Sequence, residues 1–186
     1  MRLKVLVLLL ACACGLAGAL VASAGDQGAA QQTPLRETAA RPSLSPQTVQ
    51  RIIDRYRRAT WHWERVMGRP VTLSLRRPPR QAMQRIRTWK RVATYVHWLA
   101  SRPPHLYAWN CIHRYEGAWT DSGYPYYGGL QMDIGFQQRY GSYLLRNKGT
   151  ADRWTPLEQM WVAERAYRAG RGFYPWPNTA RACGLL

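Results

Sequence analysis

The chain has 186 residues and is strongly basic, with 27 Lys and Arg against 10 Asp and Glu and a net charge of +17. A charge of this size draws a protein to polyanions, but no segment resembles a motif that reads nucleic acid. The four His show no ligand-like spacing around the cysteines, which argues against a zinc site. Because acids are scarce, each carboxylate is a candidate for a specific role.

Residues 1–24 are expected to be an export signal. Arg2 and Lys4 form a basic start, an apolar run follows, and Ala22-Ser-Ala24 is a small-residue cleavage site. The run is broken by glycine and is short for a membrane span, and no later segment is apolar enough to cross a bilayer. An alternative makes Cys12 the lipidated cysteine of a lipoprotein-type signal. In both cases the protein is expected to leave the cytoplasm, secreted or held at the cell wall in the first and lipid-anchored through Cys12 in the second. The mature chain is expected to have no transmembrane segment.

Export decides how the cysteines are interpreted. With Cys12 and Cys14 in the signal, Cys111 and Cys183 form the one pair in the mature chain. Two lone cysteines in a small domain in an oxidising compartment most simply form a disulfide. We therefore predict a Cys111–Cys183 bridge, with two free buried thiols as the alternative.

The positive charge is concentrated in one region. Residues 25–45 balance their charges, are rich in Ala, Gln, Thr and Pro, lack apolar periodicity, and are expected to be a disordered linker. Residues 46–104 carry 14 Arg and Lys against 2 acids, a net of +12, whereas residues 105–186 carry 9 against 6, a net of +3. We expect residues 46–104 to bind anionic cell-wall polymers, and we expect no nucleic-acid partner.

The basic region has the periodicity of two helices. Ser45 followed by Pro46 is a helix start, with Ser as N-cap and Pro at the first helical position. Apolar residues then recur at intervals of three and four to about Met67, and again from Met83 to Leu99. Residues 46–104 are therefore expected to form an Arg-rich helical hairpin, paired through its apolar stripes.

The remainder, residues 105–186, is expected to be a small helical domain, so that the whole protein is mainly α. Residues 117–132 are rich in glycine and turns. Glu164 is expected to pair with one of the many arginines. Helices are expected from about His105 to Glu116, from an N-cap at Asp133 to about Gly141, and from the capping box Thr155-Pro-Leu-Glu158 to Gly170.

Glu116 is the first candidate for chemistry. It stands at the end of an expected helix among Trp109, Tyr115, Trp119 and the Tyr126-Tyr127 pair. Aromatic rings that exclude water from a carboxyl group let it keep its proton to higher pH, so that it can serve as a general acid.

Several segments between Trp109 and Cys183 combine into a family pattern. They are a Cys-bearing helix leading to Glu116 and Trp119, the block Tyr126-Tyr-Gly-Gly-Leu-Gln131, Leu157-Glu-Gln-Met160 with Ala163-Glu164, and Pro175-Trp-Pro177 before Cys183. In this order they resemble the transglycosylase-like domain of resuscitation-promoting factors and, more distantly, lysozyme and lytic transglycosylases. The Tyr-Gly-Gly-Leu-Gln block carries much of the specificity.

The resemblance implies a lysozyme-like transglycosylase domain over residues 105–186. Such a domain cleaves the glycan strands of peptidoglycan beside N-acetylmuramic acid, and it needs no cofactor and no metal. Glu116 takes the position of the catalytic acid, and Gln131 falls where the family's Leu-Gln motif faces the sugar cleft. The expected substrate-binding residues are Trp119, Tyr126, Tyr127, Gly129 and Gln131.

The chain departs from the pattern in two places. In resuscitation-promoting factors the first cysteine directly precedes the catalytic Glu, whereas Cys111 lies five residues before Glu116. Chicken-type lysozymes place a second acid, an Asp, just before a Tyr-Gly-Ile-Leu-Gln-like segment, and the residue aligned with that Asp is Tyr126, the first of the block. We therefore expect a single-acid, lytic-transglycosylase route through Glu116, with hydrolysis assisted by Asp121 or Asp133 as the alternative.

Two other classes of function fit the same composition. One is a catalytically idle module that uses the aromatic residues and the charge to bind the cell wall. The other is a cationic membrane-active protein that acts through the two Arg-rich amphipathic helices.

Overall fold

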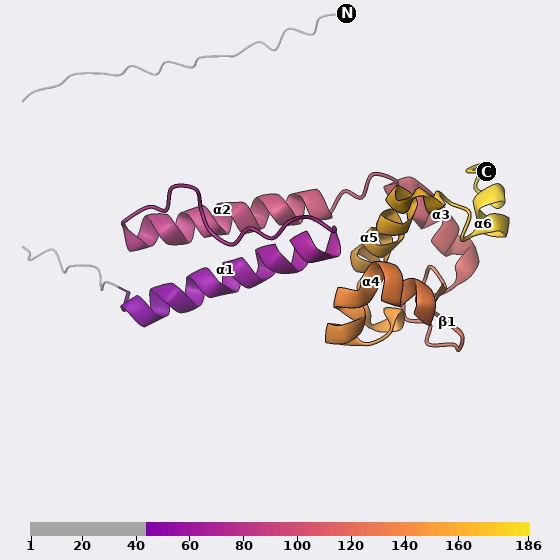
Figure 1. Cartoon of the computed structure of the whole chain (residues 1–186), viewed down its shortest axis with the longest axis horizontal. Coiled ribbons are helices and arrows are strands. Elements are labelled where there is room, and N and C mark those ends of the chain that lie inside the picture. Colours follow the sequence, from indigo (N-terminus) through magenta and orange to yellow (C-terminus); the bar gives the residue numbers. More distant parts are fainter. Residues whose placement is uncertain (1–43) are drawn as a thin grey trace, which may run out of the picture. The chain divides into compact units, whose positions relative to one another are not determined.

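The computed structural model describes residues 44–186 (Figure 1), so the expected signal and residues 25–43 of the expected linker lie outside it. The described chain is mainly helical, as predicted. None of its helices is long and apolar enough to cross a membrane. The elements are α1 (Pro46–Val66), α2 (Ala82–Ala100), α3 (Leu106–Glu116), β1 (Tyr126–Tyr127), β2 (Met132–Asp133), α4 (Ile134–Lys148), the 3-10 turn η1 (Ala151–Arg153), α5 (Pro156–Ala166), the π-helical turn η2 (Tyr167–Arg171) and α6 (Pro177–Ala182).

The two long helices α1 and α2 pack side by side, but they run in the same direction (Figure 1). The first half of each helix meets the other in one apolar cluster, in which Ile53 lies with Ile86 and Trp89. Near their C-terminal ends, the rings of Trp63 and His97 are 5.7 Å apart. The expectation of a hairpin is therefore corrected to a parallel pair, here called the α1–α2 pair.

The segment between α1 and α2 allows the two helices to run in the same direction because it returns along α1. The carboxylate of Glu64, which is 5% exposed, accepts hydrogen bonds from Thr72 N at 2.8 Å and Thr72 Oγ1 at 2.6 Å. Trp61 Nε1 donates to Thr72 O at 2.6 Å, and Arg57 Nη2 donates to Leu73 O at 3.4 Å. These bonds hold the segment against α1, so that α2 starts beside the first half of α1.

The core is continuous across the boundary expected at residue 104. Val66 and Val96 from the α1–α2 pair belong to the same buried cluster as Trp109 on α3 and Trp161 on α5. Trp161 Nε1 also donates to Ala100 O at 2.7 Å. Residues 44–186 accordingly belong to one compact unit.

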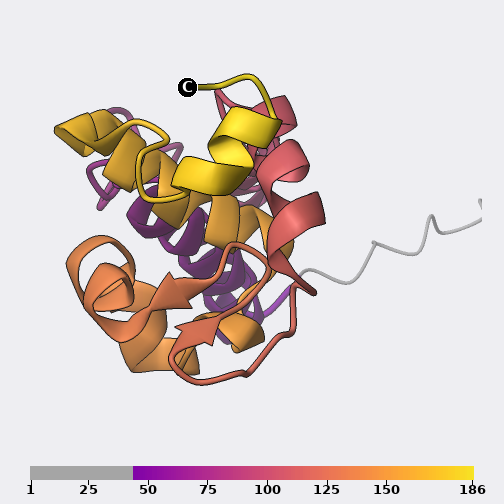
Figure 2. The same ribbon diagram turned by 90° about the vertical axis from the view of Figure 1, so that its right-hand side faces the viewer.

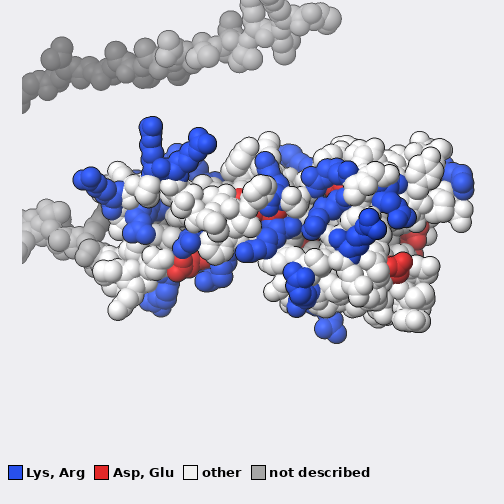
Figure 3. Space-filling view, in the orientation of Figure 1, with Lys and Arg blue, Asp and Glu red and all other residues white. Residues whose placement is uncertain are grey.

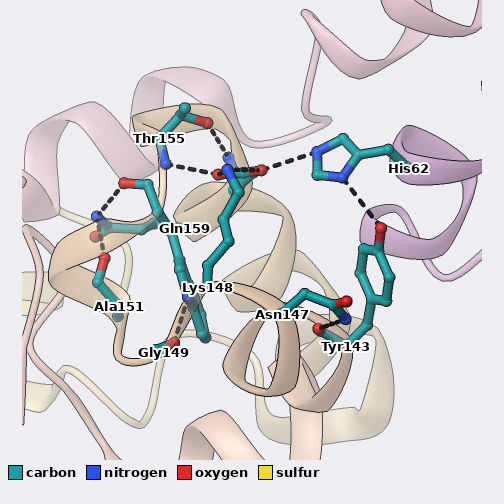
Figure 4. A network of polar contacts seen from close by, with 10 residues as sticks. His62, Tyr143, Asn147, Lys148, Gly149, Ala151, Thr155 and Gln159 are labelled. Atoms are coloured by element: carbon teal, nitrogen blue, oxygen red, sulfur yellow. Dashed lines mark hydrogen bonds and ion pairs between the residues drawn. The ribbon is translucent and has the colours of Figure 1, made fainter. Parts of the chain in front are cut away.

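A polar network around one buried carboxylate joins α1, α4 and α5 (Figure 4). The carboxylate of Glu158, 1% exposed, accepts hydrogen bonds from Lys148 Nζ at 2.7 Å and from His62 Nε2 at 2.8 Å. It also accepts from Thr155 N, which completes the predicted capping box. Burial raises the pKa of Glu158, but these donors outweigh it and lower the pKa from 4.5 to about 2.

Two helix ends differ from the sequence-based expectation. The helix capped by Asp133 kinks at Gly141, where it was expected to end, and a further helical stretch continues to Lys148. A side chain at Gly141 would meet the ring of Trp154 at 2.6 Å, so packing explains the glycine. The helix capped by Thr155 ends at Ala166, and a π-helical turn follows it.

Glu164 pairs with no arginine side chain among the described residues, contrary to the expectation. It is fully buried, and its Oε1 accepts from His105 N at 2.7 Å and from Trp109 Nε1 at 2.8 Å. Since a buried carboxylate needs donors close to it, these bonds anchor the start of α3, the helix that ends in Glu116.

Candidate active site

A cleft of about 300 Å³ opens where the end of α3 faces the segment that leads into α6. It brings together three of the residues expected at the site, one from α3, one from β1 and one from the turn before β2. The lining residues are Glu116, Tyr126, Gln131, Pro175, Trp176, Pro177 and Asn178. Trp176 is 4% exposed, and its Nε1 donates to Leu130 O at 2.6 Å, which fixes this wall of the cleft.

Glu116 is the last residue of α3 and is half-buried. Its Oε1 accepts a hydrogen bond from Thr179 Oγ1 at 2.7 Å. Gly117 follows with φ 152° and ψ −173°, a conformation that only glycine adopts readily. A side chain at Gly117 would come within 3.2 Å of both Asp121 Oδ2 and Gln131 Nε2. The chain therefore turns sharply after the acid, with Asp121 and Gln131 close to the turn.

Gln131 is held in one orientation by its amide group. Its Nε2 donates to Asp121 Oδ2 at 2.8 Å and to Gly128 O at 3.0 Å. Since an amide nitrogen has two hydrogens, both donors are used, and the carbonyl oxygen remains as an acceptor. The backbone of Gln131 has φ 48°, which is uncommon for a residue with a side chain. Such a conformation persists where neighbouring groups hold the residue in place, and here Asp121 and Gly128 hold the Gln131 side chain.

The other carboxylates near the site have structural partners. Asp121 accepts Gln131 Nε2 and, through Oδ1, Gly123 N at 2.9 Å. Asp133 accepts Phe136 N at 2.6 Å as the predicted N-cap of α4. Neither residue lines the cleft that contains Glu116.

Three residues expected to bind substrate lie outside the cleft lining. The ring of Trp119 stacks on His113 at 3.9 Å with 21° between the planes. Gly129 is buried below this pair, and a side chain there would come within 2.5 Å of His113 and 2.7 Å of Trp119. Tyr127 is half-buried and pairs with Met132 in the two-stranded ladder. Packing thus accounts for Gly129, and His113 occupies one face of the Trp119 ring.

The Cys111–Cys183 disulfide is present, as predicted, with 6.0 Å between the Cα atoms. It joins α3 to the end of α6, which lie next to each other in the end-on view (Figure 2). Because Thr179 is on α6 and Glu116 is on α3, the bridge holds the two partners of the 2.7 Å hydrogen bond together.

Sequence reasoning did not identify Thr179 or Asn178. Threonine near a C-terminus carries no motif signal, and its contact with Glu116 spans 63 residues. The disulfide was the one available signal, since it predicts that residues next to Cys183 lie near α3.

Among residues 44–186, no group of three or more His, Cys, Asp and Glu is arranged to hold a metal ion.

Comparisons of this chain with protein-family models, with curated proteins and with solved structures find no match.

Proposed function

We propose that the protein is an exported muralytic enzyme with a lysozyme-like domain, which cleaves peptidoglycan glycan strands with Glu116 as its acid. One observation carries the proposal: Glu116, from the helix, and Tyr126 and Gln131, from the two ends of the Tyr126-Tyr-Gly-Gly-Leu-Gln131 block, line the same cleft. A half-buried carboxyl group at the wall of a cleft can reach a glycosidic oxygen while it stays shielded from much of the solvent.

The proposed route needs one carboxyl group. Glu116 donates its proton to the glycosidic oxygen as the bond from that oxygen to the anomeric carbon breaks. The resulting carboxylate then takes the proton of the muramic acid C6 hydroxyl, whose oxygen bonds to the anomeric carbon. The product is a 1,6-anhydro sugar, and Glu116 is protonated again.

The structural partners of the other acids support this route over hydrolysis. A second catalytic carboxylate would have to face the sugar, whereas Asp121 orients Gln131 and Asp133 caps α4. In this proposal, the carbonyl oxygen of Gln131 accepts a hydrogen bond from the substrate, and the exposed ring of Tyr126 forms a wall of the cleft.

The test is zymography of wild type and Glu116→Gln on purified cell walls. Clearing by wild type and its loss in E116Q are expected, because the amide cannot donate a proton as an acid does. Asp54→Asn is the matched control, since it also removes one carboxylate but lies on α1, remote in sequence from the site. Clearing that survives in E116Q would overturn the proposal.

The outcome also separates the other classes of function. Binding to walls without clearing by either protein indicates a binding module, and leakage from protein-free lipid vesicles indicates a membrane-active protein. Mass spectrometry of the released fragments determines the route, because an anhydro end lacks one water relative to a hydrolysed end.

A further inference from the structure

A larger hollow, of about 680 Å³, lies along the outer side of α2. Its lining residues recur at helical intervals, and all of them are exposed. We name this surface the α2 outer face; it consists of Arg87, Lys90, Arg91, Thr94, Tyr95 and Trp98. Buried residues of the same helix, Ile86 and Trp89, pack against α1 instead.

The α2 outer face carries three cationic side chains, and no acidic side chain among the described residues pairs with them. Helix α2 contains no Asp or Glu among its 19 residues. Within residues 44–186, no carboxylate forms an ion pair with Arg87, Lys90 or Arg91. Figure 3 shows Lys and Arg side chains gathered over the α1–α2 pair, with few acidic side chains among them. An anionic partner is the one that complements such a surface.

Two aromatic residues make the surface more than a solvated charged face. Tyr95 is 59% exposed and Trp98 is 49% exposed. Their rings are nearly parallel, 15° apart with 6.0 Å between centroids, and the guanidinium of Arg102 lies 4.3 Å from the Trp98 ring. The stacked rings cover part of each other, and what they present beside the cations is the outer face of Tyr95 and the ring edges, already ordered for contact with a ligand.

The packing of α2 argues against a lipid bilayer as the partner. A helix that lies in a membrane interface inserts its main apolar face. In α2 that face is already used, because Ile86, Trp89 and Val96 are 9%, 6% and 6% exposed in contact with the rest of the protein. A row of cations that leads along one helix to an aromatic pair suits a strand-like ligand better than a flat surface.

We propose that the α2 outer face is a binding site for an anionic polysaccharide, with its acidic groups on Arg87, Lys90 and Arg91 and a sugar ring on Tyr95 and Trp98. The choice of a glycan over another linear polyanion rests on the proposed function, which places the protein in a cell wall. The site is separate from the cleft of Glu116, with which it shares no lining residue.

The test is binding of the full chain to polygalacturonate, a linear polymer with one carboxylate per sugar, measured by titration calorimetry. The triple variant R87Q/K90Q/R91Q should bind about tenfold more weakly or worse, with a smaller dependence on salt. The double variant Y95A/W98A should lose about tenfold in affinity while its salt dependence stays that of wild type. All substituted residues are exposed, so the thermal unfolding midpoint should change little.

The matched control is R51Q/R55Q/R58Q, which removes three exposed arginines that line a hollow on α1. Affinity within about threefold of wild type is expected for this control. An equal loss in both triple variants would overturn the proposal, because it would show attraction by net charge alone.

Three further arms decide the class of ligand. Neutral dextran should not bind, and phosphatidylglycerol vesicles and a single-stranded oligonucleotide should bind more weakly than polygalacturonate. Tighter binding of either one overturns the glycan assignment. E116Q should bind polygalacturonate as wild type does, so that a failure of the proposed enzymatic activity would leave this binding result intact.

Discussion

At the scale of single residues, the candidate acid depends on neighbours that have no place in the motif. Glu116 is held by a hydroxyl of α6, and the glycine after it leaves room for Asp121 and Gln131. The sequence marked Glu116 and Gln131 as candidates because they fall in the segments that carry the family resemblance. It could not identify Thr179, because a contact over 63 residues exists only in the folded chain.

Thr179 provides a prediction at this scale. Thr179→Val keeps the shape of the side chain and removes the donor to Glu116 Oε1. In the proposed route Glu116 starts as the protonated acid, so this is a hydrogen bond between neutral groups, worth about 0.5–1.5 kcal/mol. We therefore expect kcat/KM on soluble peptidoglycan to fall about two- to tenfold. Thr179→Ser retains the hydroxyl and should keep most of the activity. Equal activity of the Val and Ser variants would show that the hydrogen bond has no role in positioning Glu116.

At the scale of elements, local signals predicted where helices begin better than where they end. Ser45, Asp133 and Thr155 all cap helices as expected, because a cap is a short-range bond between neighbouring residues. The ends expected near Gly141 and Gly170 were confirmed only in part, because α4 kinks at Gly141 and continues to Lys148, and α5 gives way to a π-helical turn after Ala166. Gly141 is a glycine because Trp154 packs against it, and sequence periodicity cannot distinguish that reason from a helix stop.

The disulfide between α3 and α6 provides the prediction for this scale. It closes a loop with a sequence separation of 72, which corresponds to about 4 kcal/mol of unfolding free energy in the chain-entropy model. C111A/C183A should lose about this amount in urea denaturation and should also lose activity, because α6 carries Thr179. Reductant should destabilise wild type by a similar amount and leave the variant unchanged. A double variant as stable as the oxidised wild type would contradict this account.

At the scale of the whole molecule, Glu158 links the α1–α2 pair to the rest of the protein through His62 and Lys148 (Figure 4). Its pKa is lowered to about 2, so the unfolded chain takes up a proton at higher pH than the folded chain does. The stabilisation is therefore fully present above about pH 4.5 and is lost as the pH falls toward 2.

The corresponding prediction is that wild type loses about 3 kcal/mol of unfolding free energy through Glu158 between pH 4.5 and 2. Glu158→Gln should be less stable than wild type at neutral pH, and the gap should close over this range. Urea denaturation at several pH values measures it. Asp54→Asn, which removes a more exposed carboxylate, is the control. A gap between wild type and E158Q that stays constant with pH would refute the assignment.

The sequence by itself determined the helical class, the caps, the disulfide and the residues to examine first, because each depends on composition or on short-range patterns. The direction of α2 relative to α1, the continuous core, and the cleft that unites Glu116 with Tyr126 and Gln131 were decided by the tertiary structure. These features depend on contacts between distant segments, such as Thr72 on Glu64 and Thr179 on Glu116. Apolar periodicity reports which side of a helix is buried, but not which partner covers it or from which direction.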